Sequence, residues 1–460
     1  MVHGGQSLTD RGVNKEIAIY SRQYGKTDYD ELNRVQQEFI SMIDFENGRP
    51  LLMIKCNISY ETVIGYTAAL KARIPVIMCD ESGAGNVMRL YRPHYIWQRA
   101  LAAEPYGYAE IGKIADYILY GSIERVRYPV NENLALLLPT SGSTGSSRFV
   151  RISYDNIKYN TESIVKALRI DNTGRAALML PLNYTYGLSI VNTYLYARGS
   201  LIIGGGSAMQ RDLWEYFIRC GGNAVCGVPD TYEMLRMMEI LEREDLNIKL
   251  ATQAGGPLRT GTEKYMLELA YRRGFNWAVM YGQTEATARM TCHFLNENPE
   301  HIGSVGRVIP GGSITIDDGE IVYRGPNVSM GYADGYKDLA SGDNNHGILH
   351  TGDLGRMDEN GFLYITGRMK RFAKVSGNRV NLDDLEKIVE HYCKIRSACV
   401  ENEGRIVVVI DKSSDLKTTG VKNSISEVTG INKRLIDVRA VNRIPVNSNG
   451  KTDYRKCSEL

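Results

Sequence analysis

The feature that most constrains the fold of this chain is a regular alternation of short apolar runs with amphipathic stretches, which extends to about residue 300. Leu51–Cys56 and Ile74–Cys79 have the composition of buried strands, and Ser59–Ala72 between them has helical spacing. Strand–helix–strand units of this kind bury a parallel sheet between helices. A helix is also predicted over Asp30–Ile43. Further strands are predicted at Glu16–Tyr20, Leu134–Leu138, Ala176–Leu180, Leu201–Gly204, Ala224–Val228 and Ala278–Tyr281. The alternation therefore predicts an α/β fold.

The character of the sequence changes after residue 300. Glycines and turn residues become dense between short strand-like runs, which indicates a β-rich subdomain. A basic stretch, Arg368–Arg371, then precedes a small α+β segment with a helix at Leu382–His391, a strand at Arg405–Ile410 and a polar tail. We interpret the four cations of Arg368–Lys374 as a solvated hinge in preference to a polyanion-binding patch. The predicted domains are residues 1–367 and 368–460.

Composition excludes several classes of partner. The chain has 460 residues, with 55 Lys and Arg against 53 Asp and Glu, and this balance predicts neither a nucleic-acid nor an anionic-membrane partner. Leu188–Ile203, the most apolar window, is interrupted by Asn192 and Arg198, and the first residues lack the apolar core of a signal peptide. The eight cysteines form no close pairs and lie mostly in apolar runs. Buried, reduced thiols predict a cytoplasmic protein.

A loop rich in glycine and hydroxyl residues, Thr140–Arg148, directly follows the predicted strand Leu134–Leu138. Glycines let backbone N–H groups turn toward an anion, hydroxyls donate further hydrogen bonds, and Arg148 supplies charge. A solvent-exposed Ser/Gly linker seldom lies directly against a buried strand. We therefore predict a polyphosphate site, and the absence of a GxxxxGK[ST] pattern shows that it is not a Walker loop.

This loop resembles the TSG[ST]TGxPKG signature of the adenylate-forming superfamily, which comprises AMP-forming acyl- and aryl-CoA synthetases, peptide-synthetase adenylation domains and luciferases. The sequence departs from that signature at Ser147, Arg148 and Phe149. Further segments resemble the family's motifs in the same order, with Tyr184 where a histidine is usual. They are Pro181–Leu188, Gly227–Pro229, Gly255–Leu258, Tyr281–Glu285, Thr351–Asp353 with Gly367–Arg368, Lys374–Arg379, and Pro445 with Asn449–Lys451.

The resemblance implies ATP-dependent activation of a carboxylic acid as acyl-AMP, with Mg²⁺ bound and pyrophosphate released. Transfer to the phosphopantetheine thiol of a carrier protein or of CoA would follow. Asn449–Asp453 resembles the NGKxD ending of carrier-protein-loading enzymes, but both acceptors remain open. Two other functions also remain: a catalytically inactive nucleotide-binding or interaction protein on the same fold, and an ATP phosphotransferase.

The resemblance also assigns roles to residues. Lys451, Thr284 and Glu285 would be catalytic, with Glu285 as the Mg²⁺ ligand and Lys451 bridging the substrate carboxylate and the α-phosphate. The mobile C-terminal domain would close for adenylation and rotate about Lys370 for thioester formation. The ATP-binding residues would be Thr140, Ser141, Gly142, Ser143, Thr144, Gly145, Arg148, Gly255, Gly256, Tyr281 (on adenine), Gly282, Asp353 (on ribose) and Arg368. The hinge and thiol path would comprise Lys370, Lys374, Gly377 and Arg379.

The expected acyl pocket limits the substrate. Its lining by position in the motifs is Tyr184, Tyr186, Gln253, Ala254, Gly282, Ala288 and Met290. In peptide-synthetase domains, an aspartate that follows the motif corresponding to Pro181–Leu188 pairs with the α-amine of the substrate. In this chain no acidic residue lies between Pro181 and Ser200. An α-amino acid held in that way is therefore not expected, whereas an acid with a distal amine remains open. The two tyrosines favour a small aromatic, hydroxy or short acyl acid.

Overall fold

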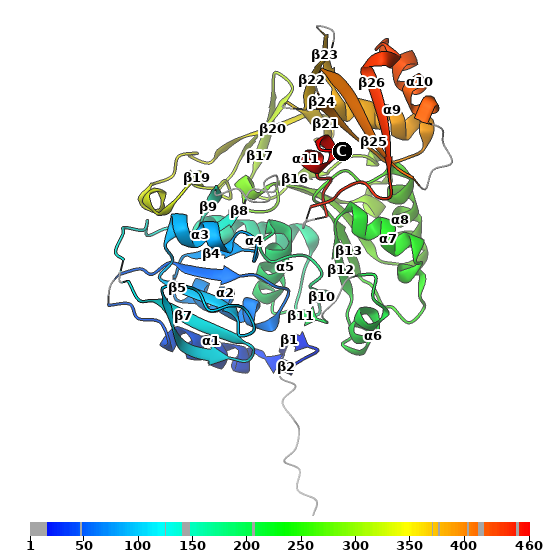
Figure 1. Ribbon diagram of the computed structural model, residues 1–460. Coiled ribbons are helices and arrows are strands. Elements are labelled where there is room, and N and C mark those ends of the chain that lie inside the picture. Colours follow the sequence, from blue (N-terminus) through cyan, green and yellow to red (C-terminus); the bar gives the residue numbers. More distant parts are fainter. Residues whose placement is uncertain are drawn as a thin grey trace, which may run out of the picture.

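The computed structural model describes residues 16–46, 48–124, 126–139, 148–204, 208–369, 371–375, 378–402, 404–412, 418–447 and 450–460 (Figure 1). Two large mixed sheets form its main body. The nine-stranded sheet has the order β16-β15-β14-β13-β12-β10-β11-β1-β2. Its strands are β1 Ile17–Ser21, β2 Gly25–Asp28, β10 Arg175–Ala177, β11 Ser200–Ile203, β12 Ala224–Gly227, β13 Leu250–Gln253, β14 Asn276–Tyr281, β15 Thr291–Phe294 and β16 Arg307–Val308.

The eight-stranded sheet has the order β19-β9-β8-β4-β3-β5-β7-β6. Its strands are β3 Leu52–Lys55, β4 Val76–Cys79, β5 Tyr95–Arg99, β6 Tyr108–Ile114, β7 Tyr117–Ser122, β8 Leu134–Pro139, β9 Phe149–Ser153 and β19 Tyr332–Ala333. The inner strands of both sheets are parallel, as the strand–helix alternation predicts. Other strands, β2, β15, β6–β7 and β9, pair antiparallel, which needs no crossover helix.

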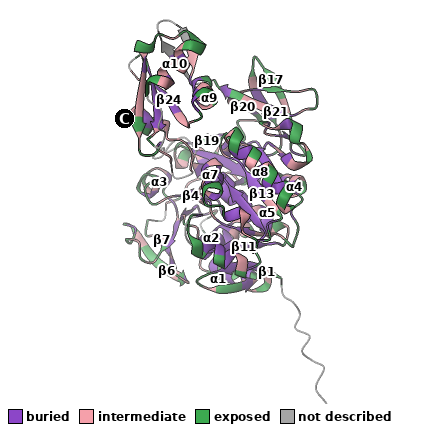
Figure 2. Ribbon diagram, turned by 90° about the vertical axis from the view of Figure 1, so that its right-hand side faces the viewer, coloured by how far each residue is buried: buried purple, intermediate pink, exposed green. Residues whose placement is uncertain are grey.

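Helices fill the space between the two sheets and cover their outer faces. Apolar residues of α2 (Tyr60–Lys71), α4 (Tyr154–Leu168) and α5 (Thr185–Tyr196) form one cluster with strands of both sheets. In β3, Leu52 and Ile54 join this cluster, whereas Met53 faces a second cluster with α3 on the other side. This alternation with a period of two explains why the whole strand is apolar. Figure 2 shows the buried residues concentrated in these central layers. The remaining helices of the two-sheet body are α1 Tyr29–Ser41, α3 Ala84–Tyr91, α6 Arg211–Arg219, α7 Pro229–Met237 and α8 Thr260–Arg273.

The β-rich subdomain predicted after residue 300 is a four-stranded antiparallel sheet. Its strands are β17 Ser313–Asp317, β18 Glu320–Arg324, β20 Ile348–Met357 and β21 Leu363–Arg368. Buried residues of β18, β20 and β21 pack with Tyr281 at the end of β14. This packing places the four-stranded sheet beside the nine-stranded one, and it brings the end of β14 close to β20.

The C-terminal elements comprise a two-stranded sheet, β22–β23, and a three-stranded sheet, β24-β25-β26, with helices on its faces (Figure 1). The sequence patterns predict only α9 and β25 here, because α10, β26 and α11 are rich in polar residues. The bounds are β22 Phe372–Val375, β23 Asn378–Asn381, α9 Leu382–Cys393, β24 Ser397–Asn402, β25 Arg405–Asp411, α10 Thr418–Thr429, β26 Ile436–Val441 and α11 Tyr454–Ser458.

The prediction that the basic stretch is solvated is wrong for Arg371. Its guanidinium pairs with Asp383 and lies 2.8 Å from Glu386 Oε1, and it stacks over the ring of Tyr454. A planar cation with several donors can satisfy two carboxylates and an aromatic face at once. Arg371 therefore belongs to the interior of the C-terminal elements.

Three other features of the sequence can be compared with the structure. All eight cysteines are free thiols. Among the described residues, no helix is long and apolar enough to cross a membrane, and no group of three His, Cys, Asp or Glu side chains could hold a metal ion. Of the two histidines near residue 350, His350 lies in β20 beside Glu320, and His346 lies in the preceding loop.

Candidate functional site

The predicted site residues gather at one edge of the nine-stranded sheet. Strands β12, β13 and β14 are parallel, so their carboxyl ends meet at the same edge. The motif segments Gly227–Pro229, Gly255–Leu258 and Tyr281–Glu285 lie at or directly follow these three ends. Ligand sites in α/β sheets form at this edge, because loops after neighbouring strands converge there.

Two glycines, Gly282 and Gly255, let the loops at this edge of the sheet pack closely against neighbouring residues. A Cβ atom added to Gly282 would lie 1.9 Å from the carbonyl oxygen of Ala288, which leaves no room for any side chain. Gly255 has φ +97°, and a Cβ atom there would lie 2.5 Å from the hydroxyl of Tyr184. Glycine is therefore required at both positions by sterics, and the two loops pack tightly against their neighbours.

Three residues predicted to contact the nucleoside converge from three strands. The hydroxyl of Tyr281 donates a 2.5 Å hydrogen bond to Asp353 Oδ2, and Arg368 Nε lies 2.9 Å from Asp353 Oδ1. Burial and the adjacent Asp353 carboxylate hold the pKa of Tyr281 well above its usual range. The phenol thus stays a donor, and the Asp353 carboxylate is held in one orientation. The predicted stacking of Tyr281 on adenine stays a prediction.

Glu285 lies beside a second group of polar residues. Its Oε1 accepts a 3.0 Å hydrogen bond from the hydroxyl of Tyr332, and the Arg148 guanidinium lies 4.1 Å from the centroid of the Tyr332 ring. Oε2 has no hydrogen-bond partner among the described residues, which leaves it available to a cation. Thr284, immediately before it, is buried with a hydroxyl that bonds to none of the described residues. Glu285 and Arg148 therefore both contact Tyr332.

Lys451 reaches this edge from the C-terminal elements. Its Nζ lies 5.3 Å from the centroid of the Tyr184 ring, and its Cε lies 3.7 Å from a Cβ atom built on Gly255. The ammonium makes no hydrogen bond or ion pair with the described part of the chain. Burial, with a smaller contribution from nearby Arg368, lowers the pKa of Lys451 to about 8. An uncompensated ammonium that burial already disfavours is suited to binding an anion.

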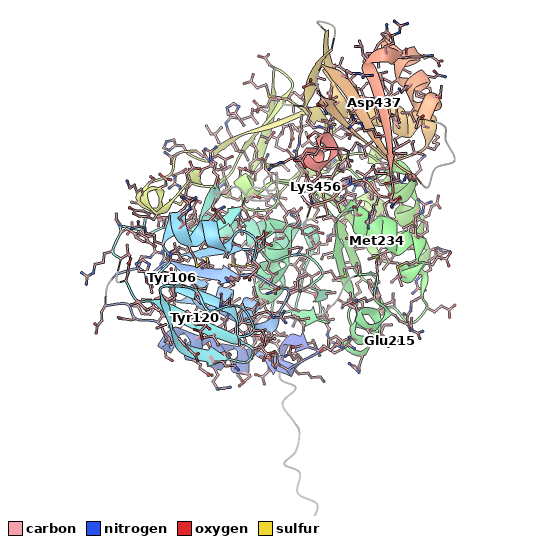
Figure 3. All side chains as sticks on the ribbon, in the orientation of Figure 1. Tyr106, Tyr120, Glu215, Met234, Asp437 and Lys456 are labelled. Carbon is pink, nitrogen blue, oxygen red and sulfur yellow. The ribbon has the colours of Figure 1, made fainter. Side chains whose placement is uncertain are left out.

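The segment that carries Lys451 is tied to α7. Arg396 Nη1 lies 2.6 Å from Asp230 Oδ1 in the first turn of α7, and Arg396 Nη2 donates a 3.1 Å hydrogen bond to Thr452, next to Lys451. Gly450 approaches Val228, because a Cβ atom there would lie 2.9 Å from Cγ2 of that residue. Figure 3 shows this side of the molecule, with Met234 labelled on α7 and Lys456 on α11. The tie explains how a C-terminal lysine is held at the edge of an N-terminal sheet.

Of the residues predicted to form the acyl pocket, Tyr184, Tyr186, Ala254 and Ala288 share one cluster of buried side chains, whereas Met290 packs with Tyr281 in another. The rings of Tyr184 and Tyr186 contact edge to face with centroids 6.4 Å apart. The hydroxyl of Tyr186 bonds to Thr252, and the amide of Gln253 donates to the carbonyl of Gly256. Burial raises the pKa of Tyr184 to about 12. The buried side chains of this group are Tyr184, Tyr186, Gln253, Ala254, Ala288 and Met290.

Sequence analysis missed one residue of this group, Arg289. Its side chain is 3% exposed, and its guanidinium lies 3.9 Å from the centroid of the Tyr186 ring. The signal was present in the sequence, because Arg289 is the only charged residue in the otherwise small or apolar run Ala286–Met290.

An unusual turn positions Arg289. Thr287 has φ +64° and ψ −54°, and the N–H of Ala288 bonds to the carbonyl of Ala286 at 2.7 Å. This three-residue turn is rare and strained for a β-branched residue. Asn327 holds it, because its amide nitrogen donates to the carbonyls of both Ala286 and Arg289. Strain retained in this way indicates that the direction of the following residues matters.

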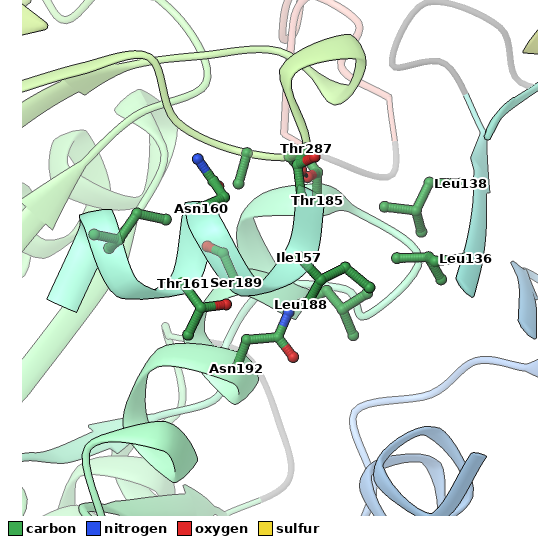
Figure 4. Close-up of a pocket in the computed structure, with 12 residues that line it drawn as sticks. Leu136, Leu138, Ile157, Asn160, Thr161, Thr185, Leu188, Ser189, Asn192 and Thr287 are labelled. Atoms are coloured by element: carbon green, nitrogen blue, oxygen red, sulfur yellow. Dashed lines mark hydrogen bonds between the residues drawn. The ribbon is translucent and has the colours of Figure 1, made fainter. Parts of the chain in front are cut away.

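A small cavity lies directly behind the site, between α4 and α5 (Figure 4). Leu136, Leu138, Ile157 and Leu188 give it apolar walls, and Thr287 closes it on the side of the strained turn. It therefore adjoins the acyl-pocket residues without including Lys451 or Asp353.

Several predicted residues lie outside the part of the chain that the structure describes. They are Thr140, Ser141, Gly142, Ser143, Thr144, Gly145, Lys370 and Gly377. Lys374 and Arg379 lie in β22 and β23, but only their backbone is described. The predicted roles of these residues stay predictions.

Comparison with known proteins identifies similar chains. A sequence model of the family described as "AMP-binding enzyme" matches residues 93–333, more than half of the chain. The oxalate–CoA ligase of Saccharomyces cerevisiae is 26% identical over 353 residues, which cover 72% of this chain and 63% of that protein. The D-alanine–D-alanyl carrier protein ligase of Staphylococcus epidermidis is 23% identical over 469 residues, which cover 94% of this chain and 93% of that protein.

Solved structures resemble this chain along nearly its whole length. The o-succinylbenzoate CoA synthetase of Bacillus subtilis in complex with its acyl-adenylate has a TM-score of 0.73 at 18% identity, covering 96% of this chain and 95% of that one. ATP-bound MatB of Rhodopseudomonas palustris has a TM-score of 0.74 at 20% identity, covering 98% and 97%. At these identities the comparison establishes a shared fold of two large sheets with C-terminal elements.

Proposed function

Because this chain belongs to the AMP-binding enzyme family, we propose that it joins a carboxylic acid to the α-phosphate of ATP and releases pyrophosphate. In this step a carboxylate oxygen forms a bond to the α-phosphorus, and the bond between the α- and β-phosphates breaks. The observation that carries the proposal is the Lys451 ammonium, which has no anionic partner among the described residues and lies over Tyr184. It is placed to compensate charge between a carboxylate and a phosphate.

The described residues divide the task between them. Asp353, oriented by Tyr281 and Arg368, would accept both ribose hydroxyls, which suits a carboxylate with two acceptor oxygens. Lys451 would neutralise the charge that gathers between the two reacting oxygens. Thr284, whose hydroxyl bonds to none of the residues that the structure describes, would donate to the α-phosphate.

Glu285 fits the requirements of a magnesium ligand. Mg²⁺ takes one or two carboxylates together with phosphate oxygens and water, and Oε2 of Glu285 is free among the described residues while Tyr332 fixes Oε1. When bound, Mg²⁺ would neutralise charge on the phosphates. Tyr332 would orient the carboxylate, and Arg148 would add positive charge on the same side.

For the second step we propose transfer of the acyl group to a pantetheine thiol, with AMP released. The S. epidermidis ligase is named for a carrier protein and the S. cerevisiae ligase for CoA, so the comparisons support either acceptor. We further propose that residues 1–367 and 368–460 are the two domains, and that the second rotates about Lys370 to bring Gly377 to the thiol path. The strands that flank this stretch, β21 and β22, belong to different sheets, which supports a division there.

The test is a screen for exchange of radioactive pyrophosphate into ATP across carboxylic acids. We expect acid-dependent and Mg²⁺-dependent exchange, with AMP as the nucleotide product of turnover. ADP would instead identify a phosphotransferase, and binding of ATP without exchange for any acid would identify an inactive nucleotide-binding protein.

A further inference from the structure

Arg289 is a buried cation that has no anionic partner in the part of the chain that the structure describes. Its side chain is 3% exposed. Nε makes a 3.3 Å contact with the sulfur of Met280 and Nη1 a 3.4 Å contact with the carbonyl of Ala288, and both are weak hydrogen bonds. Nη2 has no partner, and no carboxylate pairs with the guanidinium, among the described residues. A buried charge left in this state is costly, because neither an opposite charge nor full hydrogen bonding replaces its lost hydration.

A second buried arginine shows what a structural guanidinium looks like in this chain. Arg151 is 1% exposed, and its nitrogens donate to the carbonyls of Tyr332, Ser341 and Met330 and to the side chain of Asn344. All three of its nitrogens are therefore bonded to strong acceptors. Arg289 differs in the one respect that matters for binding, since its donors remain largely unused.

The backbone of Arg289 is held firmly although its side chain is not satisfied. Its N–H donates to Asn160 Oδ1 at 3.2 Å, and its carbonyl accepts from Asn160 Nδ2 at 2.9 Å and from Asn327 Nδ2 at 3.0 Å. The strained turn at Thr287 precedes it directly. This clamp keeps the guanidinium beside Tyr186, at the inner end of the predicted acyl pocket.

Two of the groups near the guanidinium, Tyr184 and Cys226, are uncharged side chains whose pKa values are raised by burial. Burial raises the pKa of Tyr184 to about 12 and that of Cys226 to about 11, and Arg289 is the only charged residue that acts on either group. Lys451 lies on the other side of Tyr184, with its Nζ over that ring. The two cations thus lie against different tyrosine rings, Arg289 against Tyr186 and Lys451 against Tyr184, and the centroids of these rings are 6.4 Å apart.

We propose that Arg289 binds a second carboxylate of the acid, so that this chain activates a short dicarboxylic acid. The inference rests on the proposed acid-activating function. One carboxylate would lie at Lys451 and react, while the other would accept two parallel hydrogen bonds from the Arg289 guanidinium. The planar fork of arginine matches a carboxylate in this way, and the low dielectric of the pocket strengthens the pair. An acid with a distal amine, which the sequence analysis left open as a substrate, would place its ammonium group near the positive charges of Arg289 and Lys451.

The experiment compares linear diacids from malonic to adipic acid with the monocarboxylic acid of the same carbon number. Pyrophosphate exchange is measured on the full chain, on Arg289→Met and on Arg289→Lys. The wild-type chain should prefer one diacid, and Arg289→Met should raise KM for it about 10- to 100-fold while leaving the matched monoacid unchanged or improved. Arg289→Lys, which keeps the charge but loses the fork, should lie between. Arg198→Met, at an exposed ion pair with Glu16, controls for general loss of charge.

A second readout separates failure of this inference from failure of the proposed function. The preferred diacid, added without ATP, should raise the melting temperature of the wild-type chain and not that of Arg289→Met. Exchange with monoacids only, or an equal loss for all acids together with a lower melting temperature of Arg289→Met, would show that Arg289 is structural and overturn the inference. If no acid supports exchange, the adenylation proposal fails, and diacid-dependent stabilisation alone then decides whether Arg289 binds a carboxylate.

Discussion

At the scale of single residues, the site is built from groups whose charge is compensated to different degrees. Asp353 has two partners, Glu285 has one, and Lys451 has none among the described residues. Burial lowers the pKa of the uncompensated group, Lys451, and this makes its protonation a sensitive reporter of the chemistry.

The pKa of about 8 for Lys451 predicts the pH dependence of the reaction. For the free enzyme, kcat/KM for exchange should fall as pH rises through about 8, because the ammonium loses its proton. Bound phosphates favour the charged form, so the corresponding fall in kcat should occur at higher pH. Lys451→Arg should move the fall in kcat/KM to higher pH, since a guanidinium stays protonated. An unchanged profile in this variant would assign the titration to another group.

The same shift has a consequence for stability. Because the folded pKa of Lys451 lies below the unfolded value, the native state binds fewer protons between the two values, and the free energy of unfolding should rise with pH over that range. Lys451→Met should therefore raise the melting temperature at neutral pH and abolish exchange. Calorimetry measures the rise in melting temperature of Lys451→Met over the wild-type chain, which should be smaller at pH 10 than at pH 7.

Glu285→Gln tests the assignment of the metal ligand. The amide keeps the shape of the side chain and its hydrogen bond with Tyr332 but removes the charge. Exchange should fall by about 10²–10³, or roughly 3–4 kcal/mol, by analogy with the loss of one electrostatic stabiliser. The rate is measured as a function of Mg²⁺ concentration. An unchanged rate at limiting Mg²⁺ would show that the metal is held elsewhere.

At the scale of elements, the connection between the end of β14 and β15 decides the shape of the pocket. It contains the close approach of Gly282 to Ala288 and the strained turn at Thr287. Asn327 makes three hydrogen bonds with this connection. Its side-chain amide donates to the carbonyls of Ala286 and Arg289, and its backbone carbonyl accepts from the Thr287 hydroxyl at 2.8 Å.

Asn327→Ala should destabilise the chain and misplace Arg289. Two buried carbonyls would each lose one of their two donors, at about 0.5–1.5 kcal/mol per hydrogen bond, so the loss should reach roughly 1–3 kcal/mol. Urea unfolding measures it. Asn344→Ala is a matched control, because Asn344 bonds to Arg151 away from the pocket. An equal rise in KM for the acid in both variants would contradict a special role of Asn327 in placing Arg289.

At the scale of the whole molecule, the C-terminal elements complete the site. The ion pair between Arg396 and Asp230 and the contact of Gly450 with Val228 hold Lys451 over the pocket. We interpret this arrangement as the one that performs adenylation, since Lys451 is at the site in it.

Arg396→Ala should lower the population of this arrangement. The pair is largely buried, and truncating one partner of such a pair costs about 2–5 kcal/mol. Exchange should therefore slow by at least about tenfold, while thioester formation from a supplied acyl-adenylate should change little. Asp230→Asn and the double variant complete a cycle, and additive effects in that cycle would show that the two side chains do not act together.

Two further variants separate the half-reactions. Lys451→Ala should abolish exchange and affect thioester formation from a supplied acyl-adenylate far less. Gly377→Leu should do the reverse, because a bulky side chain would obstruct the predicted thiol path. Exchange and thioester transfer are measured separately after folding is confirmed by circular dichroism. Parallel losses in both steps would contradict rotation of the C-terminal domain.

The sequence by itself determined the α/β class, the positions of most N-terminal strands and the set of motifs. Ser59–Ala72 was predicted as a helix and contains α2, Tyr60–Lys71, because a local hydrophobic period and the N-cap Ser59 report the structure directly. Edge strands and the short C-terminal elements were not predicted, since their pairing depends on distant segments and leaves little local pattern.

Only the tertiary structure decided which charges are compensated. Asp353 acquires its partners from β14 and β21, and Arg371 becomes buried because α9 supplies two carboxylates. Arg289 is the opposite case. Its sequence neighbours show a cation in an apolar run, but only the fold shows that no carboxylate of the described segments pairs with it. Local sequence records which groups a chain contains, whereas the energy of a buried charge depends on all of the groups that folding places around it.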